Sequence, residues 1–407
     1  MIEKILKPGW KVWRFDQMAT NVNVRIDNPS ESGMEHYVGL EHLDADSLKI
    51  RRWGTPHDVE ATKLMFKKGD IIFGRRRAYQ RKLGVAQFDG VCSAHAMVVR
   101  AKPEVVLREF LPFFMQSDLF MDRAVEISVG SLSPTINWKT MAVQEFALPL
   151  VDEQRRLVGI FDALEEISES LGDATAASTV LKSSLAERTF PISEVRTFLE
   201  APDAYRGRPL VRLGDIATLQ VGFPFKSAEY APHGDRLLRG SNVGVNRLIW
   251  DDAITCYWPV ARRHEVSNYV LNAGDLVIAM DRPFIAEGFK IARIAESDLP
   301  ALLLQRVGRF RLTGEITPEY LWAFLHSESF KWQLQRMQKG TDLPHISRFD
   351  IEGTLIPVLT LDEQTAVADH FAAIESAGSM LLSRWNLGCK QKKNALRELI
   401  APGASNV

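Results

Sequence analysis

The chain has 407 residues, of which 46% are hydrophobic and 25% charged, and its formal net charge at pH 7 is −1. This length allows two or three separately buried cores, and the near-zero charge argues against a protein that coats nucleic acid through a uniformly basic surface. No apolar run approaches the ~20 residues of a membrane-spanning helix, the first residues do not form a signal peptide, and the three cysteines lie far apart, as free thiols of a reducing compartment do. The sequence therefore predicts a cytoplasmic protein without a metal site.

The first half begins with a predicted β-unit. Lys68-Gly-Asp-Ile-Ile-Phe73 places a Gly-Asp turn before an apolar β-branched run, which is the pattern of a strand entry. Residues 83–87 are predicted as the partner strand, and residues 93–100 alternate as a further strand does. A helix is predicted over residues 104–126.

Between the first two of these strands lies the most basic stretch of the chain, Gly74-Arg-Arg-Arg-Ala-Tyr-Gln-Arg-Lys82. Its cations suit phosphate contacts, while arginine and glutamine can read the edges of guanine and adenine. The competing interpretation is a solvated hairpin tip. We predict DNA contacts from Arg75, Arg76, Arg77, Tyr79, Gln80, Arg81 and Lys82.

A loop and a long helix complete the first half, and the same order returns in the second. Gly130-Ser-Leu-Ser-Pro-Thr-Ile136 precedes Leu148-Pro-Leu-Val-Asp-Glu-Gln154, where a helix to about Arg188 begins. Gly340-Thr-Asp-Leu-Pro-His-Ile346 likewise precedes Ile356-Pro-Val-Leu-Thr-Leu-Asp-Glu-Gln364, where a helix to about Ile400 begins. Glycine, proline and isoleucine of the loops and both Asp-Glu-Gln triplets keep an offset of 210 residues. A unit of roughly 200 residues is therefore present twice.

The second half follows a bent connection rich in proline and glycine. Its strand entry is Ala273-Gly-Asp-Leu-Val-Ile278, with further strands predicted over residues 289–293 and 302–312. Thr317-Pro318 is a typical helix start, and Gly340 is the predicted end of that helix.

Other polar loops are candidate contacts, with plain turn chemistry as the alternative. The segment that corresponds to the basic loop, residues 280–290, differs in sequence, as two different half-sites would require. Arg51-Arg-Trp53 and the segment 239–247 are weaker candidates. The further residues for which we predict DNA contacts are Ser131, Ser133, Arg239, Asn242, Arg282, Lys290, Thr341 and His345.

The two long helices carry apolar residues at near-heptad spacing, with Ser168, Ser178, Gly378 and Gly388 between them, which indicates a coiled-coil seam. Each, at ~37 residues, would be on the order of 55 Å long. Thr360 and Glu363 have the spacing of a capping box, and Asp152 is predicted to cap the first helix by itself.

The charge and direction of these helices suggest how they pack. Residues 151–200 hold 5 Lys and Arg against 10 Asp and Glu, which suits packing on protein better than on phosphate. The first helix delivers the chain to the second half and the second leaves that half, so an antiparallel pair with one globular part at each end is expected.

Motifs of catalysis are lacking in the sequence, since it contains no phosphate-binding Gly-x-x-x-x-Gly-Lys loop, no His-Glu-x-x-His and no Gly-x-Ser-x-Gly. We predict a protein that is not itself an enzyme and holds no cofactor.

The duplicated order of motifs resembles the specificity subunits of type I restriction–modification systems. The resemblance covers nearly the whole chain and rests on two Gly-Asp entries, the arginine-rich loop, two Gly-x-x-x-Pro-x-Ile loops and two helix entries that end in Glu-Gln. Two departures are visible. Both helix entries lack a double proline, and the second half keeps only Asp281-Arg282 of an arginine-rich loop.

The resemblance implies an α+β fold: two tandem target-recognition domains of mixed or antiparallel β-structure with helices, separated by an antiparallel pair of long coiled-coil helices in a pseudo-two-fold repeat. The implied divisions are domain 1 over 1–151, a first spacer helix over 152–190, a connection over 191–208, domain 2 over 209–361, a second spacer helix over 362–400 and a tail over 401–407.

The implied function is non-catalytic recognition of a bipartite site in double-stranded DNA. Two methyltransferase subunits, which would hold S-adenosylmethionine, would dock on the spacer helices, together with motor–nuclease subunits. Two alternatives remain open, namely a detached recognition region of a fused restriction–methylation enzyme and a coiled-coil scaffold with no role on DNA.

Overall fold

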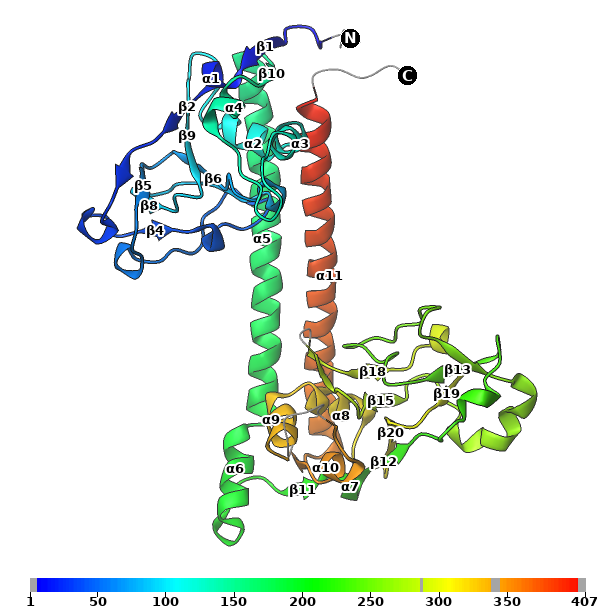
Figure 1. The fold of residues 1–407 in the computed structure, drawn as a ribbon. Coiled ribbons are helices and arrows are strands. Elements are labelled where there is room, and N and C mark those ends of the chain that lie inside the picture. Colours follow the sequence, from blue (N-terminus) through cyan, green and yellow to red (C-terminus); the bar gives the residue numbers. More distant parts are fainter. Residues whose placement is uncertain (1–5, 286–287, 338–344, 402–407) are drawn as a thin grey trace. The chain divides into compact units, whose positions relative to one another are not determined.

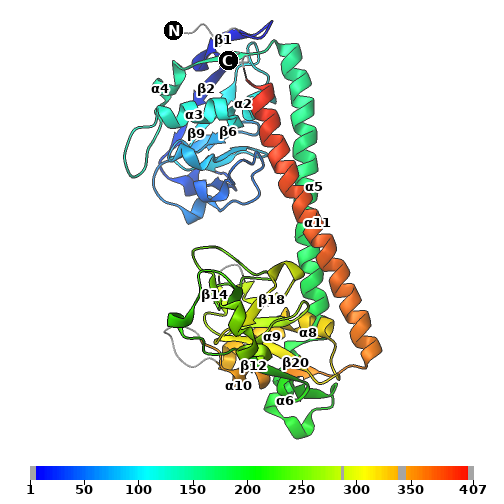
Figure 2. The same cartoon turned by 90° about the vertical axis from the view of Figure 1, so that its right-hand side faces the viewer.

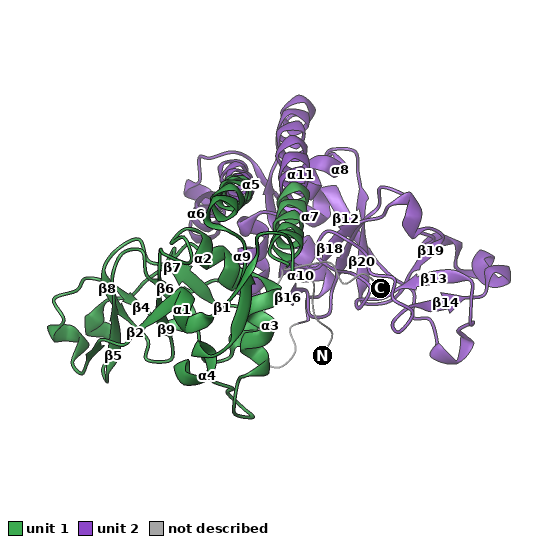
Figure 3. Cartoon of the chain, turned by 90° about the horizontal axis from the view of Figure 1, so that it is seen from above, with its two compact units in different colours: residues 1–173, 382–407 green, residues 174–381 purple. Residues whose placement is uncertain are grey.

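The computed structural model describes residues 6–285, 288–337 and 345–401. They form two compact units: unit 1 comprises Met1–Asp173 and Leu382–Val407, and unit 2 comprises Ala174–Leu381 (Figure 3). Each unit is described by itself. Within the described residues no helix combines the length and the apolar character that crossing a bilayer requires.

Unit 1 contains two four-stranded sheets, and its strand pairs are antiparallel except for β4 with β8. A separate pair joins β1 (Lys11–Arg14) to β10 (Glu145–Leu148). In spatial order the first sheet consists of β2 (Ala19–Val22), β9 (Met97–Ala101), β6 (Ile71–Phe73) and β7 (Leu83–Val85), and the second of β3 (Arg25–Ile26), β5 (Lys63–Phe66), β8 (Gly90–Cys92) and β4 (Tyr37–Val38). The short helices are α1 (Phe15–Met18), α2 (Phe110–Gln116), α3 (Asp118–Glu126) and α4 (Trp138–Ala142).

Unit 2 repeats this plan (Figure 1). Its one parallel pair among the described strands, β13 with β19, corresponds to β4 with β8. Its four-stranded sheet consists, in spatial order, of β12 (Ala217–Val221), β20 (Val307–Leu312), β15 (Leu276–Ala279) and β18 (Ile291–Arg293). A three-stranded sheet consists of β14 (Cys256–Trp258), β13 (Asp235–Leu238) and β19 (Ala301–Leu303). Two further strand pairs are β11 (Leu210–Arg212) with β21 (Leu355–Pro357) and β16 (Phe284–Ile285) with β17 (Gly288–Phe289). The helices are α6 (Ile192–Glu200), α7 (Leu213–Ile216), α8 (Pro318–Leu325), α9 (Glu328–Met337) and α10 (Arg348–Glu352).

Several predicted elements differ from the structure. The helix predicted over 104–126 is two helices, because the backbone of Ser117 is extended and its side chain caps α3 by accepting from the Phe120 N–H. The strand predicted over 302–312 is divided into β19 and β20 by a turn at Arg306, whose φ is 67°. The connection 191–208 contains α6. The helix predicted from Thr317 is likewise two helices, α8 and α9, with the Ser327 side chain accepting from the Phe330 N–H between them, and its predicted end at Gly340 lies outside the described residues. The strand predicted over 93–100 begins only at Met97, because the Ala96 N–H donates to the Ser93 carbonyl in a turn.

The two long helices are α5 (Val151–Thr189) and α11 (Leu361–Leu399). Each unit packs its globular part on both of them. The core of unit 1 includes Leu157 and Phe161 of α5 and Leu396 of α11, and that of unit 2 includes Ala186 of α5 and Phe371 of α11. The long helices are thus core elements of both units rather than appended rods.

A buried glutamine fixes the start of each long helix. Gln154 is 0% exposed; its Oε1 accepts from the Leu107 N–H at 2.8 Å, and its Nε2 donates to the carbonyls of Val105 and Pro149. Gln364, 1% exposed, makes the same three bonds at positions 210 residues later, to Thr317, Glu315 and Leu359. The repeat found in the sequence is therefore a repeat of individual hydrogen bonds.

The helices run antiparallel within each unit, as predicted (Figures 1 and 2). In unit 1 Glu165 of α5 pairs with Lys392 of α11. In unit 2 Lys182 of α5 pairs with Glu375 of α11 at 2.6 Å. From residue 165 to residue 182 of α5 the residue number of the partner on α11 falls from 392 to 375. The two ion pairs are also related by the repeat, since both glutamates and both lysines are 210 residues apart.

The predicted N-terminal cap is observed for α11 but not for α5. Thr360 and Glu363 form the predicted capping box, since the threonine Oγ1 accepts from the Glu363 N–H and the carboxylate accepts from the Thr360 N–H. The prediction that Asp152 caps α5 is wrong. Because α5 already begins at Val151, Asp152 lies in the first turn and binds Arg155 at 2.9 Å.

The small residues between the helices give a matched test. A Cβ on Gly378 would lie 2.6 Å from Oγ of Ser178, whereas a Cβ on Gly388, in the repeat-related pair, would meet Oγ of Ser168 at an ordinary 3.7 Å. Replacing a helical glycine by alanine gains about 0.5–1 kcal/mol where space allows. We expect Gly388→Ala to raise the free energy of unfolding and the midpoint of urea unfolding. The free energy of unfolding of Gly378→Ala should lie about 1 kcal/mol below that of Gly388→Ala.

The background Ser178→Ala is the control, because it removes the oxygen that the new Cβ would meet. In that background Gly378→Ala should become stabilising. Equal midpoints for the two alanine variants in the wild-type background would contradict the close contact at Gly378.

Candidate nucleic-acid interface

The basic loop of unit 1 begins directly after β6 and has a defined backbone. Ala78–Gln80 form a short 3₁₀ turn, and the arginines on either side of it, Arg77 and Arg81, adopt left-handed conformations with φ of 58° and 53°. Bulky residues in this region cost free energy and persist where the surrounding structure enforces them. This loop is therefore not a freely solvated tip.

The second predicted loop, residues 130–136, is joined to the basic loop by backbone hydrogen bonds. The Arg77 N–H donates to the Pro134 carbonyl at 2.7 Å, and the Ile136 N–H donates to the Arg75 carbonyl at 3.0 Å. Nη2 of Arg77 also reaches Oγ of Ser133 at 3.2 Å. Two motifs that are some 55 residues apart in the sequence thus form one surface, on which the side chains of Tyr79 and Ser131 are exposed.

Three of the five cations lack an acidic partner. Arg75 donates to the Ala94 carbonyl, Arg76 lies 3.3 Å from Nε2 of His95, and Arg77 contacts Ser133; within the described residues none of the three arginines forms an ion pair. Their positive charges are therefore available to an anion that approaches this surface.

Arg81 and Lys82 are held internally instead. Arg81 pairs with Asp46 at 2.5 Å and with Asp118 at 3.1 Å. Nζ of Lys82 donates to the Leu40 carbonyl at 2.7 Å. These two predicted contacts are supports of the loop, and the weaker candidates Arg51 and Arg52 are likewise bound to acids.

His95 borders the same surface and was not predicted from the sequence. Burial and then the neighbouring Arg76 and Arg75 cations lower the pKa of its imidazole below the ordinary value. His95 is therefore neutral near pH 7, when one ring nitrogen can donate and the other can accept a hydrogen bond.

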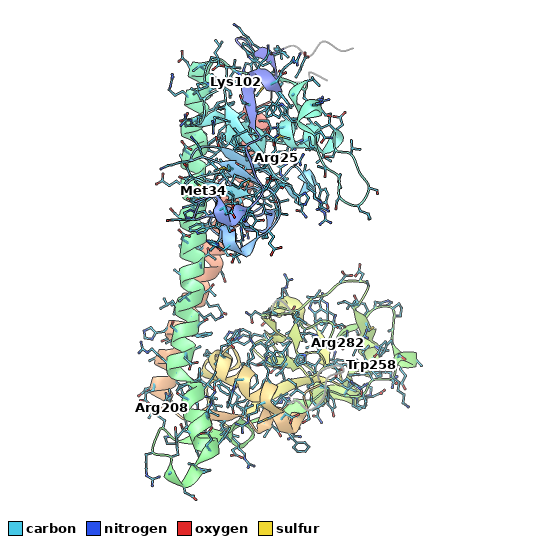
Figure 4. All side chains as sticks on the ribbon, turned by 60° about the vertical axis from the view of Figure 1, so that its left-hand side comes forward. Arg25, Met34, Lys102, Arg208, Trp258 and Arg282 are labelled. Atoms are coloured by element: carbon cyan, nitrogen blue, oxygen red, sulfur yellow. The ribbon has the colours of Figure 1, made fainter. Side chains whose placement is uncertain are left out.

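Unit 2 has the same backbone arrangement with other side chains. The Ile346 N–H donates to the Met280 carbonyl at 2.9 Å, as Ile136 does to Arg75, and Asp281 forms a β-bridge with His345. Arg282 corresponds to Arg77 and is also left-handed, with φ of 43°. Figure 4 labels Arg282 on this loop.

Three equivalent positions meet in each unit. The strand registers make Asp281 the counterpart of Arg76 and Arg306 the counterpart of His95. Asp281 pairs with Arg306 at 2.9 Å and with His345 at 2.7 Å, where unit 1 places Arg76, His95 and Thr135. The position that is a cation in unit 1, Arg76, is thus a carboxylate in unit 2, where Asp281 is bound by two basic side chains. Arg306 was missed because its position becomes visible only through the register of β15 with β20.

Two predicted contacts of unit 2 are corrected. Asn242 is 0% exposed, and its side-chain amide is bonded to the Arg239 N–H and to the Ile249 carbonyl. Lys290 is buried against the Gly240 carbonyl, and burial lowers the pKa of its ammonium group. These two residues shape their loops. Arg239 is half-buried against the Ile254 carbonyl and remains a predicted contact, and the predicted Thr341 lies outside the described residues.

Within the described part of the chain, no three His, Cys, Asp or Glu side chains are grouped so as to hold a metal ion.

Comparison with known proteins gives one consistent family of relatives. No family model matches the chain. The specificity subunit of the type I restriction enzyme MjaVIII from Methanocaldococcus jannaschii is 28% identical over 255 residues, covering 61% of this chain and 59% of that subunit. The EcoAI specificity subunit from Escherichia coli is 35% identical over 178 residues, covering 44% of this chain and 29% of that subunit. The matches thus span less than two thirds of these relatives.

Solved structures agree in fold. The S subunit of a type I restriction-modification system from M. genitalium matches over 99% of both chains with a TM-score of 0.59 at 13% identity. A chain from a structure described as the basis of complex assembly and conformational transition of the type I R-M system matches over 98% of this chain and 100% of its own, with a TM-score of 0.58 at 18% identity. The resemblance drawn from the sequence motifs and the predicted fold class are both confirmed.

The charge around His95 can be tested by titration. Arg76→Ala removes one neighbouring cation, so the pKa of His95 should rise toward its ordinary value while remaining below it, because burial persists. Histidine-selective NMR titration measures this, with Arg14→Ala as the control. A pKa that does not move would show that Arg76 is not beside the ring in solution.

Proposed function

We propose that the chain is the DNA-recognition subunit of a type I restriction–modification complex and has no catalytic activity of its own. The observation that carries this proposal is the fixed cluster of Arg75, Arg76 and Arg77 beside Ser133 and His95. Its charges lack acidic partners within the described residues. The likeness to specificity subunits supports it.

The cluster suits DNA in two ways. Guanidinium groups and hydroxyls make the phosphate contacts that fix a protein's register on a duplex, and a guanidinium can also pair with two acceptors of guanine. The backbone that presents these groups is already held by the bonds to Pro134 and Ile136. Less conformational entropy is therefore lost when DNA binds.

Each unit reads one half of a bipartite and asymmetric site. The support for this is that equivalent positions carry opposite chemistry. Arg76 offers donors only, whereas Asp281 offers acceptors only, and a carboxylate can accept from the amino group of cytosine. Two copies of one fold that carry opposite charges at an equivalent position are suited to two different half-sites.

The long helices dock two methyltransferase subunits, which hold S-adenosylmethionine, and through them the motor–nuclease subunits, in the cytoplasm. Large apolar side chains are exposed on both parts of the helix pair. They are Ile167 (54%), Leu387 (55%) and Leu382 (44%) in unit 1, and Val180 (65%), Leu181 (56%) and Met380 (55%) in unit 2. Exposed apolar residues along a helix favour a protein partner.

Removing the arginine cluster tests recognition. In host cells that depend on this chain for methylation, Arg75→Ala, Arg76→Ala and Arg77→Ala combined should abolish methylation at the site, because phosphate and base contacts of one half are lost. Single-molecule sequencing of methylated bases measures the effect.

The control triple Arg14→Ala, Arg123→Ala and Arg155→Ala removes the same charge from arginines that are paired with nearby acids. It should leave the methylated site unchanged. If the cluster variant still bound its partner subunits and still gave the wild-type methylation pattern, the chain would be a scaffold and the proposal would fail.

Docking is tested on the helices. Ile167→Glu and Leu387→Glu each place a charge on an exposed apolar position, so each should weaken co-purification of the co-expressed methyltransferase subunit at least about tenfold, without lowering the unfolding temperature. Ser170→Glu, at an exposed polar position of α5, is the control. Undiminished binding by both glutamate variants would place the docking surface elsewhere.

A further inference from the structure

A polar cavity lies beside the basic cluster in unit 1. Its volume is about 370 Å³, and its lining joins the edge strands β2 and β3 to the basic loop and the turn before β9. The polar side chains that line it are those of Asn21, Asn23, Arg25, Thr62, Arg75 and His95. No aspartate or glutamate is among the lining residues.

Three of these side chains come from consecutive alternate positions. Asn21 is in β2, Arg25 is in β3, and Asn23 lies where the chain passes between the two sheets. Alternate residues of an extended chain face the same side and are spaced by about 6.6 Å. Two base steps along a DNA strand measure about 6.8 Å. The row therefore has a spacing at which successive side chains can meet every second base.

The residue types match base edges. Asparagine can pair with two groups of adenine in the major groove, and arginine with two acceptors of guanine. Arg25 is exposed (Figure 4), and the one hydrogen bond of its side chain among the described residues is a 3.4 Å contact from Nε to Oδ1 of Asn23. Within the cavity, Nε of Arg75 is buried and has no hydrogen-bond acceptor among the described residues. The row and Arg75 are thus rich in donors, and purine edges are rich in acceptors.

The repeat shows that the row is not required by the fold. The registers of β2 with β9 and of β12 with β20 make Leu219 the counterpart of Asn21. Leu219 is 0% exposed in the core of unit 2. The same strand position can therefore serve the core with an apolar side chain, whereas unit 1 holds an amide there that faces a cavity.

We propose that Asn21, Asn23 and Arg25 form the base-reading edge of unit 1 and take purine edges of the first half-site, while Arg75 to Arg77 position the DNA beside it. This inference rests on the proposed function and names the residues that determine specificity within it. One bidentate pair contributes a discrimination of roughly 10- to 100-fold against the wrong base.

The test uses the chain assembled with its methyltransferase subunits and a pool of DNA duplexes randomised in both half-sites. The bound fraction is sequenced. Arg25→Ala should lower the preference for one base in one half-site by about 10- to 100-fold, and Asn23→Ala should relax a different position of the same half. The other half-site should keep its preference. Arg14→Ala, on the exposed strand β1, is the matched control.

Arg25→Lys separates base reading from phosphate binding. Lysine keeps the charge but not the planar fork, so overall affinity should persist while the base preference is lost. Uniformly weaker binding of the alanine variants with an unchanged base preference would overturn the proposal, and so would wild-type behaviour of all three variants. If the wild-type assembly itself showed no base preference, the proposed function would fail instead.

Discussion

The side-chain amide of Gln154, and its counterpart in Gln364, is the interaction on which the rest of each unit depends. A buried amide with three partners is costly to disturb, since every lost partner leaves a desolvated polar group. In unit 1 this amide ties the start of α5 to the chain that enters α2. The end of α2 in turn supplies the Gln116 carbonyl that accepts from Arg81 at the base of the basic loop. A short chain of contacts thus leads from the long helix to the site.

The duplication separates the residues of the scaffold from those of the site. Several positions that bond internally carry the same residue types in both copies. The glutamines, the Glu165–Lys392 and Lys182–Glu375 pairs and the lysines Lys82 and Lys290, which donate to the carbonyls of Leu40 and Gly240, all behave in this way. Positions that face outward beside them differ, as Arg76 and Asp281 do. One chain therefore shows which contacts its fold needs and which it leaves to vary.

The sequence was sufficient to predict the repeat, the two long helices, their direction and the capping box at Thr360, because each of these rests on local spacing or on connectivity. It was also sufficient to locate the basic loop. It was not sufficient to separate free cations from bound ones, because the partners of Arg81 and Lys82, at Asp46 and Leu40, are some 35 to 42 residues away. The partners of Asn242 are only 3 and 7 residues away, but the sequence alone did not reveal that its side chain is completely buried. The break at Ser117 had a local signal, a serine followed by aspartate, which is typical of a helix start.

Net charge is a poor guide to the site for a related reason. Part of the acidic excess of α5 is engaged within unit 1, where Glu165 pairs with Lys392 and Glu169 pairs with Lys49 and Arg51. A phosphate responds to charges within about a Debye length, roughly 8–10 Å at physiological salt. The net charge of the side chains within that distance therefore determines whether the surface attracts it. The three arginines after β6 are positive and pair with no acid in the part of the chain that the structure describes, although the whole chain is nearly neutral. Beside these ion pairs, apolar side chains such as Ile167 are exposed on the same helix, which can therefore offer a surface to a protein.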